Sequence, residues 1–141
     1  MKLEVKKLDP EAKLPTRAHP DDAGLDLYSL EECVLSSGER RGVKTGIALA
    51  IPTGFAGLIW DKSSVGVKGG IKTIGGVIDA AYRGEILVGL VNLSQEPYII
   101  EKGSKIAQLL IQKVELPVVC EVSELDDTIR GTGGFGSTGK T

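Results

Sequence analysis

Residues 86–93 read Ile-Leu-Val-Gly-Leu-Val-Asn-Leu, and this run decides the fold class. The side chains of a strand alternate between its two faces. Both faces are apolar here, one with Ile86, Val88 and Leu90 and the other with Leu87, Val91 and Leu93. Antiparallel strands usually keep one face in water, so we expect another sheet or another subunit to cover the second face. The pattern favours a homo-oligomer, with a two-layer monomer as the alternative.

Short apolar runs separated by turn residues continue on both sides of this strand. The further strands that we expect are residues 3–5, 23–29, 33–35, 43–51, 55–60, 74–79, 98–100 and 105–114. Residues 65–70 contain too much glycine for a helix longer than one turn. Since no segment keeps a period of 3.6 residues, the sequence predicts an all-β sandwich or barrel.

The composition of the chain limits the function classes. With 141 residues it is long enough for one domain with its own core. A net charge of -2 argues against a general basic surface for nucleic acid. Cys33, Cys120 and His19 are a poor ligand set for zinc. There is no apolar signal region and no run long enough to cross a membrane, so we expect a cytoplasmic protein.

Three stretches carry residues suited to phosphate chemistry, and each has a plainer alternative. Residues 61–64, Asp-Lys-Ser-Ser, combine a cation with two hydroxyls, but they also suit an ordinary polar turn. Asp79 follows an apolar run flanked by glycines, where a catalytic carboxylate or a turn-capping aspartate is about equally expected. Gln108 lies among apolar residues and needs a partner, whether backbone, a neighbouring subunit or a ligand.

The C-terminal run 130–141, Arg-Gly-Thr-Gly-Gly-Phe-Gly-Ser-Thr-Gly-Lys-Thr, contains a match to the phosphate-loop pattern GxxxxGK[ST]. In that loop the final hydroxyl residue opens a helix, whereas this sequence stops at Thr141. We therefore expect phosphate-binding chemistry without the P-loop scaffold. A flexible polar tail is the alternative.

Five segments in order resemble the motifs of the trimeric deoxyuridine triphosphatases, the dUTPases. They are AGLDLYS at 23–29, DKSSVG at 61–66, GGVIDAAYRGE at 75–85, GSKIAQL at 103–109 and RGTGGFGSTGK at 130–140. The resemblance implies a jelly-roll-like β fold of the β-clip type, with at most a short helical turn. It implies hydrolysis of dUTP to dUMP and pyrophosphate with Mg²⁺, in a homotrimer whose sites draw residues from all three subunits. Such enzymes limit uracil incorporation into DNA and supply dUMP for dTMP synthesis.

The resemblance also implies residue roles. Asp79 positions the water that attacks the α-phosphorus, Ser63 eases charge onto the leaving pyrophosphate, and Asp26 holds the metal through water. Tyr82 packs against deoxyribose, the backbone of residues 74–76 reads uracil, and Phe135 stacks on the base. The substrate-binding set is Lys62, Ser64, Thr73, Ile74, Gly76, Tyr82, Lys105, Gln108, Arg130, Phe135, Gly136, Ser137 and Thr138.

The resemblance further predicts two regions. Residues 1–124 form the β-barrel domain, and residues 125–141 form a linker and an arm that closes over a neighbouring subunit's site. Lys62 and Lys105 stand where arginine is usual, Ala80-Ala81 replaces a pair that often includes an acid, and Thr73 replaces an occasional asparagine. A deoxycytidine triphosphate deaminase is the nearest rival, and the lack of an acid in residues 87–91 argues against it. A catalytically silent nucleotide-binding trimer is the second rival.

Overall fold

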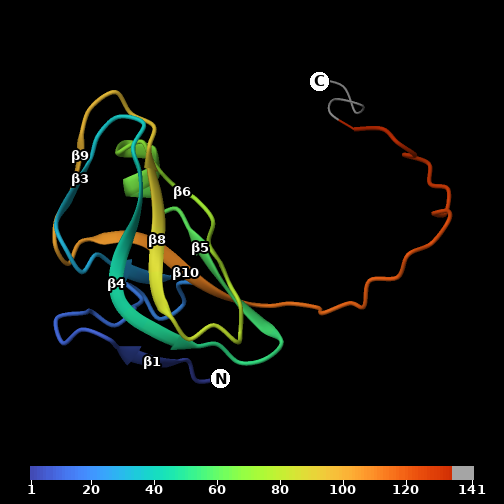
Figure 1. Ribbon diagram of the computed structural model, residues 1–141, viewed down its shortest axis with the longest axis horizontal. Coiled ribbons are helices and arrows are strands. Elements are labelled where there is room, and N and C mark those ends of the chain that lie inside the picture. Colours follow the sequence, from blue (N-terminus) through green and yellow to red (C-terminus); the bar gives the residue numbers. More distant parts are fainter. Residues whose placement is uncertain (135–141) are drawn as a thin grey trace.

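The computed structural model describes residues 1–134, which form antiparallel strands and one helical turn (Figure 1). The elements are β1 (Glu4–Lys7), β2 (Leu25–Tyr28), β3 (Cys33–Leu35), β4 (Arg40–Ala50), β5 (Phe55–Trp60), η1 (Ser64–Lys68), β6 (Ile71–Thr73), β7 (Val77–Ile78), β8 (Glu85–Asn92), β9 (Tyr98–Ile100) and β10 (Lys105–Lys113). This arrangement confirms the all-β prediction and the single short helical turn. No helix among residues 1–134 is long and apolar enough to cross a membrane.

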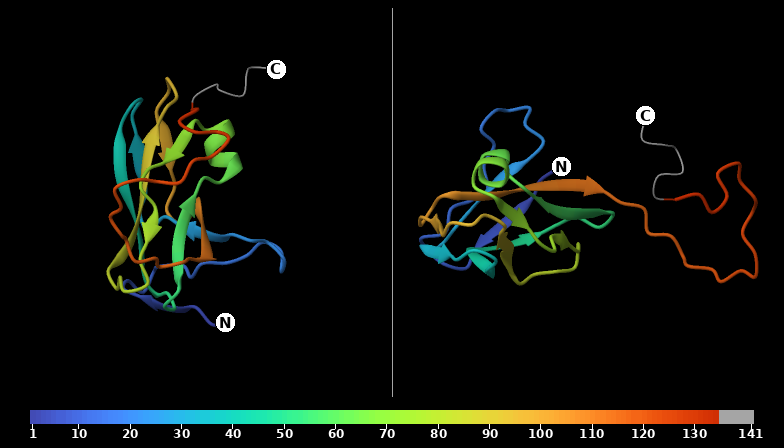
Figure 2. Two further views of the ribbon diagram at one scale, coloured as in Figure 1. Left: turned by 90° about the vertical axis from the view of Figure 1, so that its right-hand side faces the viewer. Right: turned by 90° about the horizontal axis from the view of Figure 1, so that it is seen from above.

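Two four-stranded sheets enclose the core. Their strand orders are β1-β4-β8-β6 and β2-β10-β5-β7, and β3 pairs with β9 in a small third sheet. In Figure 2 the strands lie in facing layers, with η1 at one end. Fully buried side chains from both large sheets meet between them, including Leu27 and Leu109 from one sheet and Val43, Ile86 and Val88 from the other.

The apolar run that begins at Ile86 forms β8, and the two faces of this strand differ. Ile86, Val88 and Leu90 lie in the core with at most 1% of their surface exposed. On the opposite face Leu87 is 50% exposed and Leu93, just after the strand, is 66% exposed. Within residues 1–134 no second sheet of the same chain covers this face. We call Leu87, Val91 and Leu93 the outer β8 stripe.

Residues 74–79 do not form the single strand predicted from their apolar side chains. The strand β6 ends at Thr73 and β7 begins at Val77, with a turn between them. Gly75 and Gly76 have φ angles of 72° and 106°, and residues that carry a Cβ rarely adopt such positive values. The two glycines therefore turn the chain from β6 in one sheet to β7 in the other, and the prediction of one continuous strand was wrong. We call this turn, residues 74–76, the glycine hairpin, although β6 and β7 do not pair with each other.

The chain leaves the sheets after β10. The Val114 amide donates to the Gly54 carbonyl at 2.9 Å, and the following residues run away from the sheets in Figure 1. Val118 and Val119 are 93% and 94% exposed. The boundary at residues 124 and 125 stays a prediction.

Candidate active site

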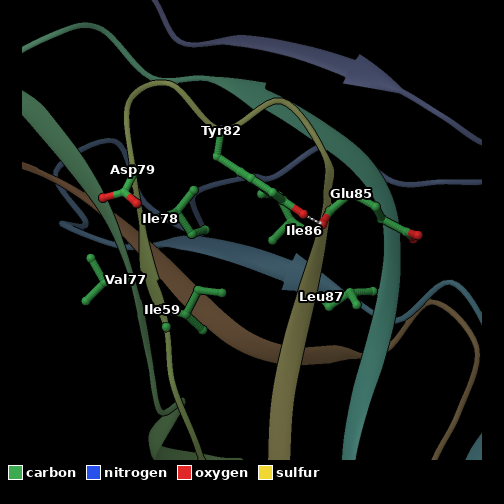
Figure 3. Close-up of a pocket in the computed structure, with 9 residues that line it drawn as sticks. Ile59, Val77, Ile78, Asp79, Tyr82, Glu85, Ile86 and Leu87 are labelled. Atoms are coloured by element: carbon green, nitrogen blue, oxygen red, sulfur yellow. Dashed lines mark hydrogen bonds between the residues drawn. The ribbon is translucent and has the colours of Figure 1, made fainter.

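A cavity of about 240 Å³ lies beside the glycine hairpin between β6 and β7 (Figure 3). The Ile59 amide donates to the Gly76 carbonyl at 2.8 Å, and the Ile74 amide donates to the Gly89 carbonyl at 2.9 Å. These bonds fix both sides of the turn to neighbouring strands. The cavity is lined by Ile59, Gly76, Val77, Ile78, Asp79, Tyr82, Glu85, Ile86 and Leu87.

Asp79 and Tyr82 reach this cavity from a tight turn that follows β7. The Tyr82 amide donates to the Asp79 carbonyl at 3.1 Å, and the Tyr82 hydroxyl donates to the Glu85 carbonyl at 3.0 Å. In Figure 3 the Asp79 carboxylate lies at one end of the cavity, and the Tyr82 hydroxyl points to the Glu85 backbone at the other. A Cβ on Gly84 would lie 2.4 Å from the Tyr82 hydroxyl, so the ring packs directly against this glycine. The structure thus fixes a carboxylate and an aromatic ring in one cavity.

A second group of predicted residues surrounds Asp26 on β2. Its carboxylate accepts from Lys62 Nζ at 2.9 Å and pairs with Lys105 Nζ at 2.6 Å. Burial alone would raise the pKa of Asp26, but hydrogen bonds from Lys105 and Lys62 and their charges outweigh burial and lower that pKa. The same contact raises the pKa of Lys105. The result is a buried carboxylate held ionised between two cations that remain partly exposed.

Gln108 and Ser63 lie next to this ion-pair group. Gln108 is the register partner of Asp26 on one side and of Trp60 on the other. Its Nε2 donates to the Asp61 carbonyl at 2.8 Å, so the partner that the sequence required is backbone. Ser63 is exposed and precedes η1, and its side chain makes no capping hydrogen bond to this turn.

The two groups occupy opposite edges of one sheet. Asp26 is on β2 and Asp79 follows β7, and the strand order is β2-β10-β5-β7. Three spacings of about 4.8 Å put these edges roughly 14 Å apart. None of Asp26, Lys62, Lys105 and Gln108 lines the hairpin cavity. One chain therefore brings Asp79, Tyr82 and Gly76 together, and separately brings Asp26 together with its cations.

Comparison with known proteins places this geometry in a family. A dUTPase family model matches residues 10–139. The chain belongs to the dUTPase family. It is 49% identical over 142 residues to a deoxyuridine 5'-triphosphate nucleotidohydrolase from Rhodococcus erythropolis, covering 99% of this chain and 87% of the relative. It is 50% identical over 142 residues to the Corynebacterium glutamicum enzyme of the same name, covering 99% and 95%.

Solved dUTPase structures share the fold. The dUTPase of Staphylococcus bacteriophage 80alpha with dUpNHpp superposes with a TM-score of 0.92 at 33% identity, covering 98% of each chain. A mutant dUTPase from phage phi11 of S. aureus, described for its coordination of a structural Mg(II) ion, gives a TM-score of 0.84 at 29% identity and covers 90% of this chain and 100% of its own. The β-clip, jelly-roll-like fold expected from the dUTPase resemblance is confirmed.

Of the remaining predicted dUTPase residues, Thr73 lies directly before the glycine hairpin, Arg130 lies apart from both groups, and four lie outside the described residues. The Thr73 hydroxyl donates to Asp61 Oδ1 at 2.7 Å. Arg130 is exposed, its Nε donates to the Gly133 carbonyl at 2.9 Å, and its segment runs away from the sheets in Figure 1. Phe135, Gly136, Ser137 and Thr138 lie outside the described residues.

Two carboxylates that sequence reasoning missed belong to these surroundings. Glu85 lines the cavity, and its Oε1 accepts from the Gly46 amide at 2.9 Å. Asp61 accepts from Thr73 and from Lys72 Nζ. The sequence signal for both is that they lie within predicted motifs, where Glu85 follows Gly84 and Asp61 precedes Lys62. Their partners are distant in sequence, so no local pattern could name them.

Proposed function

We propose that this chain hydrolyses dUTP to dUMP and pyrophosphate with Mg²⁺, as a homotrimer with shared active sites. The observation that carries the proposal is the hairpin cavity, where Asp79 and Tyr82 lie beside a glycine turn. A carboxylate can direct water, a ring can contact the sugar, and a glycine turn lets backbone approach the base, so together these groups suit a pyrimidine deoxynucleotide. The names of the relatives support dUTP as that nucleotide.

Asp79 orients the water that attacks the α-phosphorus. A carboxylate at the end of a short fixed turn can accept a hydrogen bond from water and take its proton as the new P–O bond forms. The bond from the α-phosphorus to the bridging oxygen then breaks, and pyrophosphate leaves. The apolar side chains of Ile59, Ile78 and Ile86 around the cavity limit competing water.

Asp26 is the residue that holds the metal, through water. Asp26 presents one ionised carboxylate, which can hydrogen-bond to metal-bound water once Lys62 and Lys105 turn to the substrate phosphates. That donor set suits Mg²⁺, because this ion commonly keeps several waters and shares its remaining ligands with substrate phosphates. When bound, Mg²⁺ neutralises charge on the triphosphate.

The cations and hydroxyls beside Asp26 bind the phosphates. Lys62 and Lys105 are 29% and 40% exposed in their side chains, so each can turn its ammonium group toward an incoming anion. Lysine gives charge without the bidentate geometry of arginine, which favours this exchange of partners. Ser63 eases charge onto the leaving pyrophosphate. Ser64, Gln108 and Arg130 complete the phosphate contacts.

Specificity for dUTP comes from the hairpin cavity. The Tyr82 ring is held by its hydroxyl at Glu85 and by close contact with Gly84. A ring fixed against deoxyribose leaves no space for a 2′-hydroxyl, which excludes UTP. The backbone at Ile74 and Gly76 binds the hydrogen-bonding edge of uracil. Cytosine has a donor where uracil has an acceptor, and an acceptor where uracil has a donor, so it does not match this backbone. Each buried mismatch of this kind is unfavourable by about 1–3 kcal/mol. Thr73 borders this site.

Two features of the single chain support the proposed homotrimer. The Asp79 group and the Asp26 group lie on opposite edges of one sheet, which suits a site that takes one group from each of two neighbouring chains. The outer β8 stripe offers an apolar face that a partner chain can cover. Residues 125–141 form the arm that closes a neighbour's site, with Arg130, Gly136, Ser137 and Thr138 on phosphates and Phe135 on the base. The cytoplasmic location stays a prediction from the sequence.

The test is turnover of dUTP with the Asp79→Asn variant beside the wild type. We expect the wild type to release pyrophosphate, and the variant to bind dUTP with similar affinity in calorimetry while turnover falls at least ~10³-fold. Asparagine keeps the size of the side chain but cannot accept a proton from water. Undiminished hydrolysis by the variant would remove Asp79 from its role, and no hydrolysis by the wild type would contradict the function.

A further inference from the structure

Asp61 joins three segments that the proposed site uses. Its Oδ1 accepts from the Thr73 amide at 2.8 Å and from the Thr73 hydroxyl at 2.7 Å. Its Oδ2 pairs with Lys72 Nζ at 2.6 Å, and its backbone carbonyl accepts from Gln108 Nε2 at 2.8 Å. The residue stands between the end of β5 and the Lys62-Ser63-Ser64 loop.

These contacts cross from one sheet to the other. Asp61 follows β5, in the sheet β2-β10-β5-β7, whereas Thr73 ends β6 in the sheet β1-β4-β8-β6. Thr73 is also the last residue before the glycine hairpin. The Asp61 contacts add a side-chain anchor to the backbone bonds at Ile74 and Gly76, since Gly75 and Gly76 bring no side chains of their own.

The amide of Gln108 is positioned by the same residue. A Cβ on Gly24 would lie 2.3 Å from Gln108 Oε1, so this side chain lies closely against the backbone beside β2. Its other end is held by the Asp61 carbonyl. Asp61 therefore contacts the hairpin anchor through its side chain and Gln108 through its backbone, and it directly precedes the phosphate loop.

We propose that Asp61 is a positioning residue, which fixes the glycine hairpin and the phosphate-binding loop relative to each other through its double contact with Thr73. The proposal rests on the proposed function for its catalytic consequences. The contact with Lys72 is secondary, since both partners are partly exposed and such ion pairs contribute little. Burial would raise the pKa of Asp61, but hydrogen bonds from Lys72 and Thr73 outweigh it and lower that pKa, so the side chain accepts as a carboxylate.

The test compares four variants of the full chain. Asp61→Ala removes both acceptors, and Asp61→Asn keeps one oxygen for Thr73. Lys72→Met removes the ion pair and the longer contact of 3.5 Å from Lys72 Nζ to the Thr73 hydroxyl, but leaves both Asp61 bonds to Thr73 in place. Ile47→Val weakens the core at a residue that is 1% exposed and not in contact with the hairpin cavity. Steady-state kinetics with dUTP and dCTP and hydrogen exchange of the amides in residues 73–78 are measured for each.

We expect Asp61→Ala to raise KM for dUTP about tenfold and to lower the dUTP-to-dCTP ratio of kcat/KM by a similar factor. Its hairpin amides exchange at least about tenfold faster in the free protein. Asp61→Asn shows a smaller form of each change. In Lys72→Met and Ile47→Val the dUTP-to-dCTP ratio of kcat/KM stays within about twofold of the wild type.

Unchanged hairpin exchange in Asp61→Ala would overturn the proposal, as would an equal change of the ratio in Ile47→Val. The exchange measurement needs no substrate. A wild type that fails to hydrolyse dUTP would contradict the proposed function alone, and the exchange result would still decide whether Asp61 holds the hairpin. If Asp61→Ala does not fold, the hairpin exchange and the substrate ratio of Asp61→Asn are compared with those of Lys72→Met instead.

Discussion

The outer β8 stripe gives the sharpest test of the trimer. Leu93 is 66% exposed in the single chain, and lysine can stand there without disturbing the core. Full burial of a leucine side chain stabilises by about 1.5–3 kcal/mol. Burial of the exposed two thirds of Leu93 in an interface therefore stabilises the assembly by about 1–2 kcal/mol per chain. Across three chains Leu93→Lys removes roughly 3–6 kcal/mol, which weakens assembly by about 10² to 10⁴. Three lysine charges brought close together weaken it further.

The assay is sedimentation over a range of concentrations, with dUTP turnover measured on the same samples. We expect Leu93→Lys to dissociate at concentrations where the wild type is a trimer, and to lose activity as it dissociates. Ile99→Lys is the matched control, because Ile99 is 63% exposed and lies on β9, away from the stripe. A Leu93→Lys variant that stays trimeric, or an Ile99→Lys variant that dissociates equally, would refute the reasoning.

Two further predictions concern the arm and Asp26. Removing all residues after Ile129 should leave a folded trimer with greatly reduced dUTP turnover, because the strands end at Lys113; full activity of the truncated protein would remove the arm from catalysis. The lowered pKa of Asp26 stabilises the fold above the unfolded-state pKa, and this contribution is lost as pH falls through the folded-state pKa. Asp26→Asn should therefore lower the free energy of unfolding, measured in urea at neutral pH, by about 1–2 kcal/mol; the loss is small because solvent screens the two lysines. As pH falls toward ~3, the stability of the variant should decrease less steeply than that of the wild type. Parallel curves of stability against pH would contradict this.

The fold was largely predictable because strand periodicity is a local property. Residues 55–60 and 98–100 form strands with the predicted bounds, and β8 differs from its prediction only at its ends. The failure at residues 74–79 has a local cause as well. Apolar composition was taken as a strand, although Gly75 and Gly76 adopt positive φ and turn the chain.

The site was predictable only in part, because its contacts are between distant segments. The resemblance named Asp79 and Tyr82, and the structure brings both into one cavity. It did not indicate that Lys62 and Lys105 would pair with Asp26. Strand pairing of β2 with β10 and β10 with β5 creates that group, and pairing is decided by the whole fold.

The most direct test of the central claim is a substrate panel of dUTP, UTP, dCTP and dTTP, each assayed for pyrophosphate and the nucleoside monophosphate with and without Mg²⁺. The proposed site predicts rapid conversion of dUTP to dUMP with Mg²⁺ and strong loss when the ion is chelated. UTP should be rejected by the fixed Tyr82 ring, and dCTP by the hairpin backbone. Equal turnover of UTP and dUTP, or release of orthophosphate in place of pyrophosphate, would contradict the account.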